Sequence, residues 1–371
     1  MARLVALALP AGPAFIDELQ RIWEAGDAVF PLDLRLPAPA RQRVLDELRP
    51  DRIVDEHGSA ALACGRSVEP GDALVVATSG TTGAAKGVVL THEAVAASAR
   101  ATSARLGVDP ATDRWLACLP VAHVGGLAVI ARSLVTKTPV TALPAFDARG
   151  ATAAARAGCT LVALVPTALA RLDPAMFRVI IVGGSRPPAD LPPNAVTTYG
   201  MTETGSGVVY DGVAIDGVEI RIADDGEIHL RGPMLLRAYR NGHDPKDADG
   251  WLATGDLGRW GDDGRLVVHG RRGELIITGG ENVWPEAVEA ALAGAPGVSD
   301  VAVIGRDDDE WGQRVVAVVV PASTTTSPTL DALRGIVRAQ LPAFCAPREL
   351  VLVDAIERTA LGKIRRDRLP R

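Results

Sequence analysis

The chain is poor in several residue types, and each shortage excludes a class of protein. Its four cysteines, at positions 64, 118, 159 and 345, are far apart and stand in apolar surroundings. This spacing predicts neither a zinc site nor a disulfide framework, so we expect buried thiols. No apolar run approaches the roughly 18 residues of a membrane-spanning helix, and the first residues lack the pattern of a signal peptide. We therefore expect a cytoplasmic protein without a membrane span.

The chain of 371 residues also lacks an excess of basic residues over acidic ones. Its formal net charge is −6 and its isoelectric point is about 5.6. Proteins that bind nucleic acids or anionic membrane surfaces gain affinity from a concentrated basic face. Only residues 365–368 are locally basic. A nucleic-acid partner is thus not expected. With 47% hydrophobic residues, the chain is long enough for a large core and more than one domain.

Lysine is the rarest of the charged residues, since only Lys86, Lys137, Lys246 and Lys363 occur among 39 basic residues. Arginine serves for the other positive charges. A lysine kept in a glycine-rich context therefore indicates a site that needs a compact ammonium group. Lys86 and Lys363 both stand in such a context, whereas the other two are better explained as chance survivors of an arginine bias.

One stretch, residues 74–89 with the sequence LVVATSGTTGAAKGVV, has the composition of a phosphate-binding loop. Residues 74–77 read as a buried strand, and ten small or polar residues follow. Such a loop buries nothing apolar, but it offers backbone N–H groups, hydroxyls, glycines that admit close approach, and one cation. The residues that could hold a polyphosphate are Thr78, Ser79, Gly80, Thr81, Thr82, Gly83 and Lys86.

The spacing within this stretch differs from that of a P-loop. A P-loop has adjacent Gly and Lys, then Ser or Thr, then a helix. Here Lys86 follows Ala85, precedes Gly87 and leads into the apolar residues 88–90. We therefore predict a phosphate loop between two strands. From this stretch alone, a glycine-rich surface hairpin is the alternative.

Helical and strand patterns alternate over the first two hundred residues, which predicts an α/β domain. Three of its strands end in small, polar, glycine-bearing loops. They contain His123, the segment 183–185 and the segment 199–204. Because strand ends at one edge of such a sheet form the ligand crevice, we expect these loops to lie near the phosphate loop. For His123, a packed structural histidine is the equal alternative.

Glu203 stands between the hydroxyls of Thr202 and Thr204. Mg²⁺ takes one or two carboxylates and completes its octahedron with water and phosphate oxygen. The sequence therefore makes Glu203 a candidate ligand for Mg²⁺ against phosphates. An ordinary surface carboxylate is the alternative.

From residue 218 onward, short strands separated by Asp/Gly turns predict a small β subdomain. Asp256 follows a tight turn there and could accept two hydroxyl protons from a ribose, with a turn-capping role as the alternative. A compact α+β unit follows, so we predict domains at 1–272 and 273–371 with a hinge at Gly273. The second domain ends with Lys363 on a glycine-bearing loop, and this suggests a mobile lid that carries a catalytic cation.

Taken together, these motifs resemble the adenylate-forming superfamily of acyl-CoA synthetases, firefly luciferase and peptide-synthetase adenylation domains. The match is ordered and extends along the chain. TSGTTGAAKG resembles the phosphate loop of the family, PVAHVGG its acyl-pocket motif, and VGGS and YGMTET its adenine and metal motifs. WLATGD resembles the segment with the ribose aspartate, GRRGELIITGGENVWPEAVE the hinge, and RTALGKIRR the C-terminal lysine motif.

By position, the resemblance implies a role for each motif residue. Lys363 would stabilise the transition-state charge of adenylation, Thr202 would contact the adenylate phosphate, and His123 would line the acyl pocket. Asp256 and Arg271 would hold the ribose. The metal would be held by Glu203 and Thr78, and further nucleotide contacts would come from Gly183, Gly184, Ser185, Tyr199, Gly200 and Met201. The acyl group would be contacted by His123, Gly126, Arg132, Ser185 and Thr204.

The sequence departs from the family pattern at two positions. Gly273 stands where the family often has Asp or Lys as its hinge residue, and Glu357 stands where Pro is frequent. Glycine tolerates a large backbone rotation, so the first departure is compatible with a moving lid. The second leaves Lys363 in place.

The short length and the run of motifs look most like the short actinobacterial o-succinylbenzoate:CoA ligases of menaquinone biosynthesis. The resemblance implies ATP, Mg²⁺ and CoA as partners, and a pocket for an aromatic keto-acid with a second carboxylate. Arg132, nine residues after His123, is our candidate cation for that carboxylate, and an ordinary surface arginine is the alternative.

Two other functions stay open on the sequence. An adenylating enzyme could activate another acid or load a carrier protein instead of CoA. A non-catalytic nucleotide-binding module would bind ATP without carboxylate-dependent release of pyrophosphate, although intact Lys363 and Glu203 argue against it. The oligomeric state is open as well, and a homodimer is one of the states that the resemblance allows.

Overall fold

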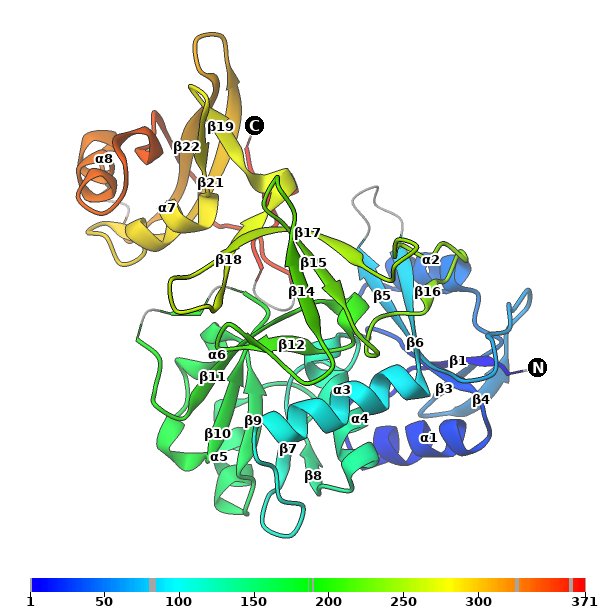
Figure 1. The fold of residues 1–371 in the computed structure, drawn as a ribbon. Helices are drawn as coiled ribbons and strands as arrows, with labels where there is room; N and C mark the ends of the chain where they lie inside the picture. Colours follow the sequence, from blue (N-terminus) through cyan, green and yellow to red (C-terminus); the bar gives the residue numbers. More distant parts are fainter. Residues whose placement is uncertain are drawn as a thin grey trace. The chain divides into compact units, whose positions relative to one another are not determined.

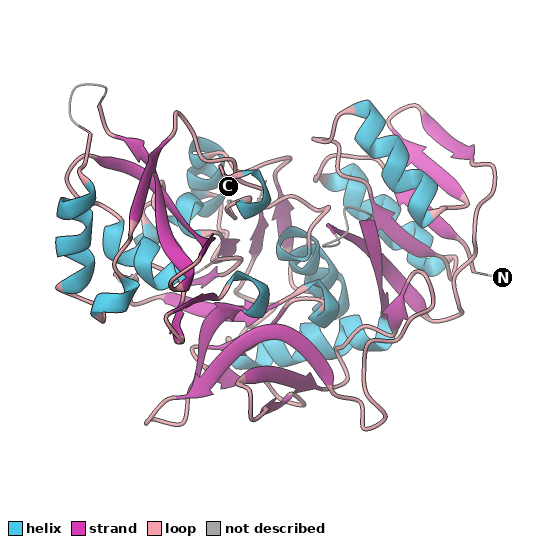
Figure 2. Ribbon diagram, turned by 90° about the horizontal axis from the view of Figure 1, so that it is seen from above, coloured by secondary structure: helices cyan, strands magenta, loops and turns pink. Residues whose placement is uncertain are grey.

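The computed structural model describes residues 2–79, 85–185, 187–188, 190–323, 327–359 and 363–370. The chain forms two compact units. The first contains Met1–Ile220 and Leu230–Ala253, and the second contains Arg221–His229 and Thr254–Arg371. Figure 1 follows the chain by colour, and Figure 2 separates helices from strands. The predicted α/β fold with a large N-terminal domain and a small C-terminal domain is confirmed.

The first unit contains two seven-stranded sheets. In one of them the order is β16-β6-β5-β2-β1-β3-β4, and β1 pairs in parallel with β2 and β3 while β5 and β6 form an antiparallel hairpin. Its core is built from apolar side chains such as Leu4, Phe30 and Val75, all nearly inaccessible to solvent. The strands are β1 Leu4–Leu7, β2 Ala28–Pro31, β3 Arg52–Asp55, β4 Gly58–Ala61, β5 Asp72–Ser79, β6 Ala85–Thr91 and β16 Ala238–Tyr239.

The other sheet of this unit has the order β13-β12-β11-β10-β9-β7-β8. Strands β8, β7, β9, β10 and β11 run parallel, and β12 and β13 continue the sheet in antiparallel pairing. The central strands read as continuous apolar runs because both faces of a parallel sheet are covered. The strands are β7 Trp115–Ala117, β8 Val140–Ala142, β9 Leu161–Leu164, β10 Val179–Val182, β11 Ala195–Gly200, β12 Gly207–Tyr210 and β13 Val213–Ala214.

The helices of the first unit begin where local sequence favours a helix start. Pro13 opens α1, a position at which the missing N–H of proline is not needed. Thr91 caps α3, because its hydroxyl accepts the N–H of Ala94 at 3.1 Å. Helices α3 and α4 lie side by side (Figure 1). The helices are α1 Pro13–Glu24, α2 Ala38–Leu48, α3 His92–Arg105, α4 Val124–Thr136, α5 Ala148–Arg156 and α6 Pro166–Leu169, with 3-10 turns η1 Pro174–Met176 and η2 Thr202–Thr204.

The second unit includes most of a four-stranded sheet and a five-stranded sheet packed against two helices. The first of these sheets has the order β14-β15-β17-β18, with β14 Glu219–Ile222, β15 Glu227–Arg231, β17 Leu252–Trp260 and β18 Leu266–Arg271. In the other, β20-β19-β22-β21 are neighbours and β23 pairs with β22. Its elements are β19 Ile276–Thr278, β20 Glu281–Val283, α7 Pro285–Leu292, β21 Val298–Asp308, β22 Gly312–Pro321, α8 Leu330–Arg338 and β23 Glu349–Leu352, with 3-10 turns η3 Arg272–Glu274, η4 Ala343–Cys345 and η5 Arg366–Arg368.

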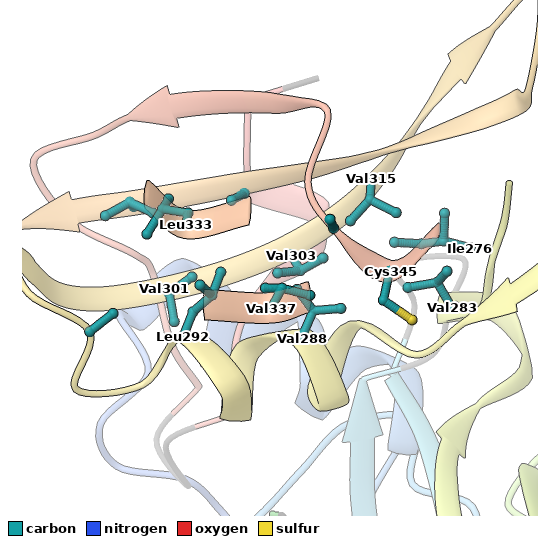
Figure 3. Packing of buried hydrophobic residues seen from close by; sticks show 14 residues of the cluster. Ile276, Val283, Val288, Leu292, Val301, Val303, Val315, Leu333, Val337 and Cys345 are labelled. Carbon is teal, nitrogen blue, oxygen red and sulfur yellow. The ribbon is translucent and has the colours of Figure 1, made fainter. Parts of the chain in front are cut away.

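The core of the C-terminal sheet follows the two-residue period of its strands. Val301 and Val303 of β21 point toward α7 and α8, whereas Ala302 and Ile304 belong to a cluster on the opposite face. Figure 3 shows the first cluster, in which side chains of the strands interlock with those of the helices. Since both faces of β21 and β22 are buried, this small sheet has a complete core of its own.

The structure corrects three expectations from the sequence. Asp256 does not follow a tight turn directly but lies within β17. The pair Gly125-Gly126 after His123 reads as a turn in the sequence, but both residues belong to helix α4. Cys64 is exposed, while the other three cysteines are buried as expected. In the described residues, no helix has the length and apolar character needed to cross a bilayer.

Candidate functional site

The two ends of the phosphate loop predicted from the sequence lie in the neighbouring antiparallel strands β5 and β6. Thr78 pairs with Lys86 across the two strands, and its hydroxyl donates to the Lys86 carbonyl at 3.3 Å. Gly87 must be glycine because a Cβ there would lie 2.7–2.9 Å from atoms of Leu48, Arg240 and Val75. The predicted position between two strands is confirmed. Gly80, Thr81, Thr82 and Gly83 lie outside the described residues.

Lys86 reaches the edge of a small cluster of polar side chains. Its Nζ atom lies 5.2 Å from the centre of the Tyr239 ring. The Tyr239 hydroxyl donates to Oε1 of Glu203 at 2.9 Å, and the N–H of Leu236 donates to the Glu203 carbonyl at 2.7 Å. The candidate phosphate cation, Lys86, therefore lies against the ring of Tyr239, and the candidate metal ligand, Glu203, is bound to its hydroxyl.

The donor set around Glu203 suits Mg²⁺ bound to a phosphate. Among the described residues, no group of three His, Cys, Asp or Glu side chains could enclose a metal ion. One carboxylate near a phosphate loop is the arrangement that Mg²⁺ uses when water and phosphate oxygens fill its remaining positions. Glu203 is therefore the residue that would hold the ion, and Tyr239 donates a hydrogen bond to its carboxylate.

The loops after β10 and β11 provide the other predicted nucleotide contacts. Gly183, Gly184 and Ser185 directly follow β10, and both Gly184 and Ser185 are exposed. Tyr199 and Gly200 end β11, Met201 follows, and Thr202 opens the 3-10 turn η2. Thr204 is fully buried, and its hydroxyl accepts the N–H of Met201 at 2.9 Å and lies 2.6 Å from the Ser206 carbonyl. Its side chain therefore shapes the loop that presents Glu203.

His123 stands directly before α4, where its backbone forms the N-cap. Its Nε2 atom lies 3.8 Å from Asp33, a carboxylate that Arg35 holds at 2.7 Å. Burial and the Arg35 guanidinium lower the pKa of His123, and Asp33 opposes them. His123 is therefore a neutral imidazole at neutral pH. Gly126, in the first turn of the helix, must be glycine because a Cβ would lie 2.2 Å from the Leu119 carbonyl oxygen.

Arg132 lies on α4 and is only 3% exposed, so the alternative of a surface arginine is wrong. Its guanidinium carbon lies 4.9 Å from the centre of the Trp115 ring, and its Nη2 donates to the Ser206 hydroxyl at 3.2 Å. Among the described residues, its Nε and Nη1 have no hydrogen-bond partner. Burial lowers the pKa of this guanidinium. Arg132 also lines a mainly apolar pocket formed by residues of β5, β6, α3 and α4, together with Gly205.

A buried cation with two unused donors is costly unless an anion completes it, because each unpaired buried polar group loses its hydration. The Arg132 guanidinium could therefore donate hydrogen bonds to the carboxylate of a ligand.

Asp256 and Arg271 meet within the second unit. They face each other across β17 and β18, and Nε of Arg271 lies 2.8 Å from Oδ1 of Asp256. Arg271 also donates from Nη1 to the Thr254 carbonyl at 3.0 Å. The pair that the resemblance assigned to a ribose is therefore brought together by strand pairing.

The side chain of Lys363 is exposed, and its backbone is held by two hydrogen bonds to Thr359. Its carbonyl accepts the Thr359 N–H at 2.7 Å, and its N–H donates to the Thr359 hydroxyl at 3.1 Å. These bonds close the ends of the lysine loop. Residues 360–362 between them lie outside the described residues.

A cluster of charges lies beside this loop, where Arg366 contacts Glu274, Glu286 and Glu289 at 2.7–3.3 Å. Burial acts to lower the pKa of Arg366, but the carboxylates raise it overall. Burial acts to raise the pKa of Glu274, and Arg366 and Lys363 lower it overall. The pKa of Glu286 is raised, mainly by burial. Glu274 thus stays ionised between Arg366 and the candidate catalytic lysine.

Two residues of this site escaped the sequence analysis. Tyr239 contacts both Lys86 and Glu203, and Arg240 holds the backbone beside them through carbonyls of Leu48 and Ser67 at 3.0 and 2.9 Å. Neither stands in a glycine-rich loop. The one feature of the sequence that could have pointed to them is the aromatic residue in the segment RAYRNG, which belongs to none of the motifs described above.

The first unit contains the strand pair that flanks the predicted phosphate loop, with Glu203 linked to it through Tyr239, and the second unit contains the loop with Lys363. The chain belongs to the AMP-binding enzyme family. The model of this family matches residues 65–240, and that of the AMP-binding enzyme C-terminal domain matches residues 287–363.

Relatives with assigned activities cover most of the chain. It is 41% identical over 362 residues to "Probable 2-succinylbenzoate--CoA ligase" of Mycobacterium tuberculosis, covering 90% of this chain and 94% of the relative. It is 36% identical over 329 residues to "2-succinylbenzoate--CoA ligase" of Listeria monocytogenes, covering 80% and 69%. It is also 35% identical over 339 residues to "Indoleacetate--CoA ligase" of Aromatoleum aromaticum, covering 79% and 66%.

Solved structures agree with these relatives. o-Succinylbenzoate CoA synthetase from Bacillus subtilis in complex with its acyl-adenylate intermediate superposes with a TM-score of 0.86 at 26% identity, covering 99% of this chain and 87% of that one. The same enzyme with ATP and magnesium ion gives a TM-score of 0.86 at 25% identity, covering 99% and 89%. The adenylate-forming fold is therefore confirmed.

Proposed function

We propose that this protein is an AMP-forming acid:CoA ligase that converts o-succinylbenzoate to o-succinylbenzoyl-CoA. Arg132 is the observation that carries the choice of acid. Its buried guanidinium has two donors without a hydrogen-bond partner among the described residues, which suits an acid with a second carboxylate. The relatives named for this substrate in Mycobacterium and Listeria support the same choice.

The first half-reaction activates the acid. A carboxylate oxygen attacks the α-phosphorus of ATP, the acyl-adenylate forms, and pyrophosphate leaves. Thr78, Ser79, Lys86 and the loop between them would bind the phosphates, Thr202 would contact the α-phosphate, and Glu203 would hold Mg²⁺, which neutralises phosphate charge when bound. Lys363 would stabilise the charge that develops during the attack.

The second half-reaction transfers the acyl group to CoA. The thiol sulfur of CoA attacks the acyl carbonyl, a thioester forms, and AMP leaves. We place the domain boundary between residues 272 and 273, with Gly273 as the hinge. Gly273 lies in η3, has no positive φ, and a Cβ on it would meet nothing within 4 Å. Since packing does not require glycine there, its backbone freedom is the reason that fits a hinge.

Asp256 would accept hydrogen bonds from both ribose hydroxyls, and Arg271 would orient that carboxylate. In the acyl pocket, neutral His123 would give a polar but uncharged wall, and Gly126 and Ser185 would line it. ATP, CoA and the acid are the expected small-molecule partners, and the cytoplasm is the expected place of action. A homodimer stays a prediction that analytical ultracentrifugation would test.

Pyrophosphate release from purified protein tests the proposal directly. With ATP, Mg²⁺ and o-succinylbenzoate, release should depend on the acid, and added CoA should yield thioester and AMP. Benzoate and indoleacetate are tested as alternative acids, and a carrier protein is tested as an alternative acceptor to CoA. Faster turnover of indoleacetate would contradict the choice of acid, and loading of a carrier protein in preference to CoA would contradict the choice of acceptor.

The phosphate hairpin makes a prediction of its own. Lys86→Ala should raise the KM for ATP or lower kcat by at least tenfold, since a hydrogen bond to a charged group contributes about 1.5–3 kcal/mol. Lys86→Arg should not restore the parent value, because a planar guanidinium does not replace a compact ammonium. Steady-state kinetics with varied ATP measure both effects. Unchanged kinetics in Lys86→Ala would remove the hairpin from the site.

A further inference from the structure

We propose that Tyr239 is a positioning residue that holds Glu203 ready for Mg²⁺ and Lys86 ready for phosphate. This role rests on the proposed function, because it concerns the binding of ATP with its metal. Tyr239 is half-buried, and one side chain makes both contacts. The hydroxyl donates to Oε1 of Glu203 at 2.9 Å, and the ring centre lies 5.2 Å from Nζ of Lys86.

The backbone around Tyr239 is fixed on both sides. Tyr239 pairs with Val88 in the antiparallel β16–β6 ladder, two residues after Lys86. On one side, the N–H of Leu236 donates to the Glu203 carbonyl at 2.7 Å. On the other, the N–H of Arg240 donates to the Gly87 carbonyl at 2.6 Å. The segment 236–240, which includes strand β16, therefore links the strand that carries Lys86 with the turn that carries Glu203.

Arg240 anchors this linking strand to the rest of the first unit. It is only 8% exposed, and its guanidinium donates to carbonyls of Leu48, Ser67 and Arg66. Its charge is stabilised by carbonyl dipoles, although burial lowers its pKa to about 10. Because Arg240 is the next residue, this anchor limits the positions that the Tyr239 ring can take.

Each part of the tyrosine side chain has a separate effect. The hydroxyl donates to one oxygen of Glu203, and among the described residues the other oxygen has no hydrogen bond, so it can face a cation. A hydrogen bond to a metal-binding carboxylate fixes its orientation, and loss of such a bond typically lowers metal affinity by about 10–100-fold. The ring attracts the Lys86 ammonium through its negative face. Phenylalanine would keep the second effect and lose the first.

The test is the binding of ATP to the full-length protein without acid or CoA, measured by isothermal titration calorimetry with excess Mg²⁺ and again with EDTA. Tyr239→Phe should raise the Kd for ATP by about tenfold or more in Mg²⁺. In EDTA it should bind ATP within twofold of the parent. Tyr239→Leu should weaken binding in both conditions, because Lys86 then loses its aromatic support as well.

Tyr210→Phe is the matched control, because it removes a hydroxyl that contacts Thr102 elsewhere in the same unit at 3.2 Å. It should leave both Kd values unchanged. Parent-like binding by Tyr239→Phe in Mg²⁺ would overturn the proposed role. An equal loss in Mg²⁺ and EDTA would overturn it too, since the hydroxyl would then only support the fold. If the parent itself binds ATP no better with Mg²⁺ and releases no pyrophosphate, the proposed function fails and this role fails with it.

Discussion

Replacing Lys363 with alanine should lower the rate of acyl-adenylate formation by about 10²–10³-fold, because a preorganised group that meets developing charge contributes that much. Thioester formation from supplied acyl-adenylate and CoA should continue near the parent rate, since that step needs no cation at the α-phosphate. The backbone bonds between Lys363 and Thr359 do not involve the lysine side chain, so the loop should keep its shape. Rapid-quench assays of the two half-reactions measure the contrast.

Two further variants serve as a control and as a test of the second half-reaction. Arg368→Ala removes another exposed cation of the same domain and should change neither step. Gly273→Pro should slow thioester formation and largely spare adenylation, because a fixed φ hinders rotation at the hinge. Equal slowing of both steps by Lys363→Ala would mean that the C-terminal domain acts as a static cover.

Replacing Arg132 with methionine should lower kcat/KM for o-succinylbenzoate by about 10–100-fold, since a hydrogen bond to a charged group contributes about 1.5–3 kcal/mol and each 1.36 kcal/mol is tenfold in rate. An aromatic mono-acid should lose less than about threefold. The melting temperature should not fall, because an apolar side chain of similar length often replaces a poorly paired buried charge without loss of stability. Steady-state kinetics with both acids and a thermal melt measure these effects.

Arg171→Met serves as the control, because it removes an exposed guanidinium that stacks on Phe146 in the same unit. It should leave the ratio of the two acids unchanged. Equal losses for both acids in Arg132→Met would show that Arg132 supports the fold instead of binding the second carboxylate. A marked drop in melting temperature would point the same way.

Local patterns were enough to predict much of the fold. The apolar run before Thr78 and the valines after Gly87 predicted two strands around a polar loop, and the structure has them as β5 and β6. The start of α3 has an equally local cause, because the hydroxyl of Thr91 accepts the N–H three residues later. Such features depend on neighbours in the sequence, so the sequence is sufficient to find them.

Other features depend on contacts between distant segments and could not be read locally. Gly125 and Gly126 look like a turn, but close packing of α4 against the Leu119 carbonyl explains the second glycine. The burial of Arg132 follows from the contact of α4 with β7 and the loop at Ser206. The role of Tyr239 needs two partners, at positions 86 and 203, that no spacing rule connects to it.

The contact of Arg366 with Glu274 has a mechanical consequence. Glu274 directly follows the hinge residue, and Arg366 comes three residues after Lys363. Arg366 therefore ties the segment that follows Lys363 to Glu274, and Glu286 and Glu289 hold the same guanidinium. If Gly273 is the hinge, as proposed, the ion pair of Arg366 with Glu274 would make the segment that carries Lys363 turn together with the residue that follows the hinge.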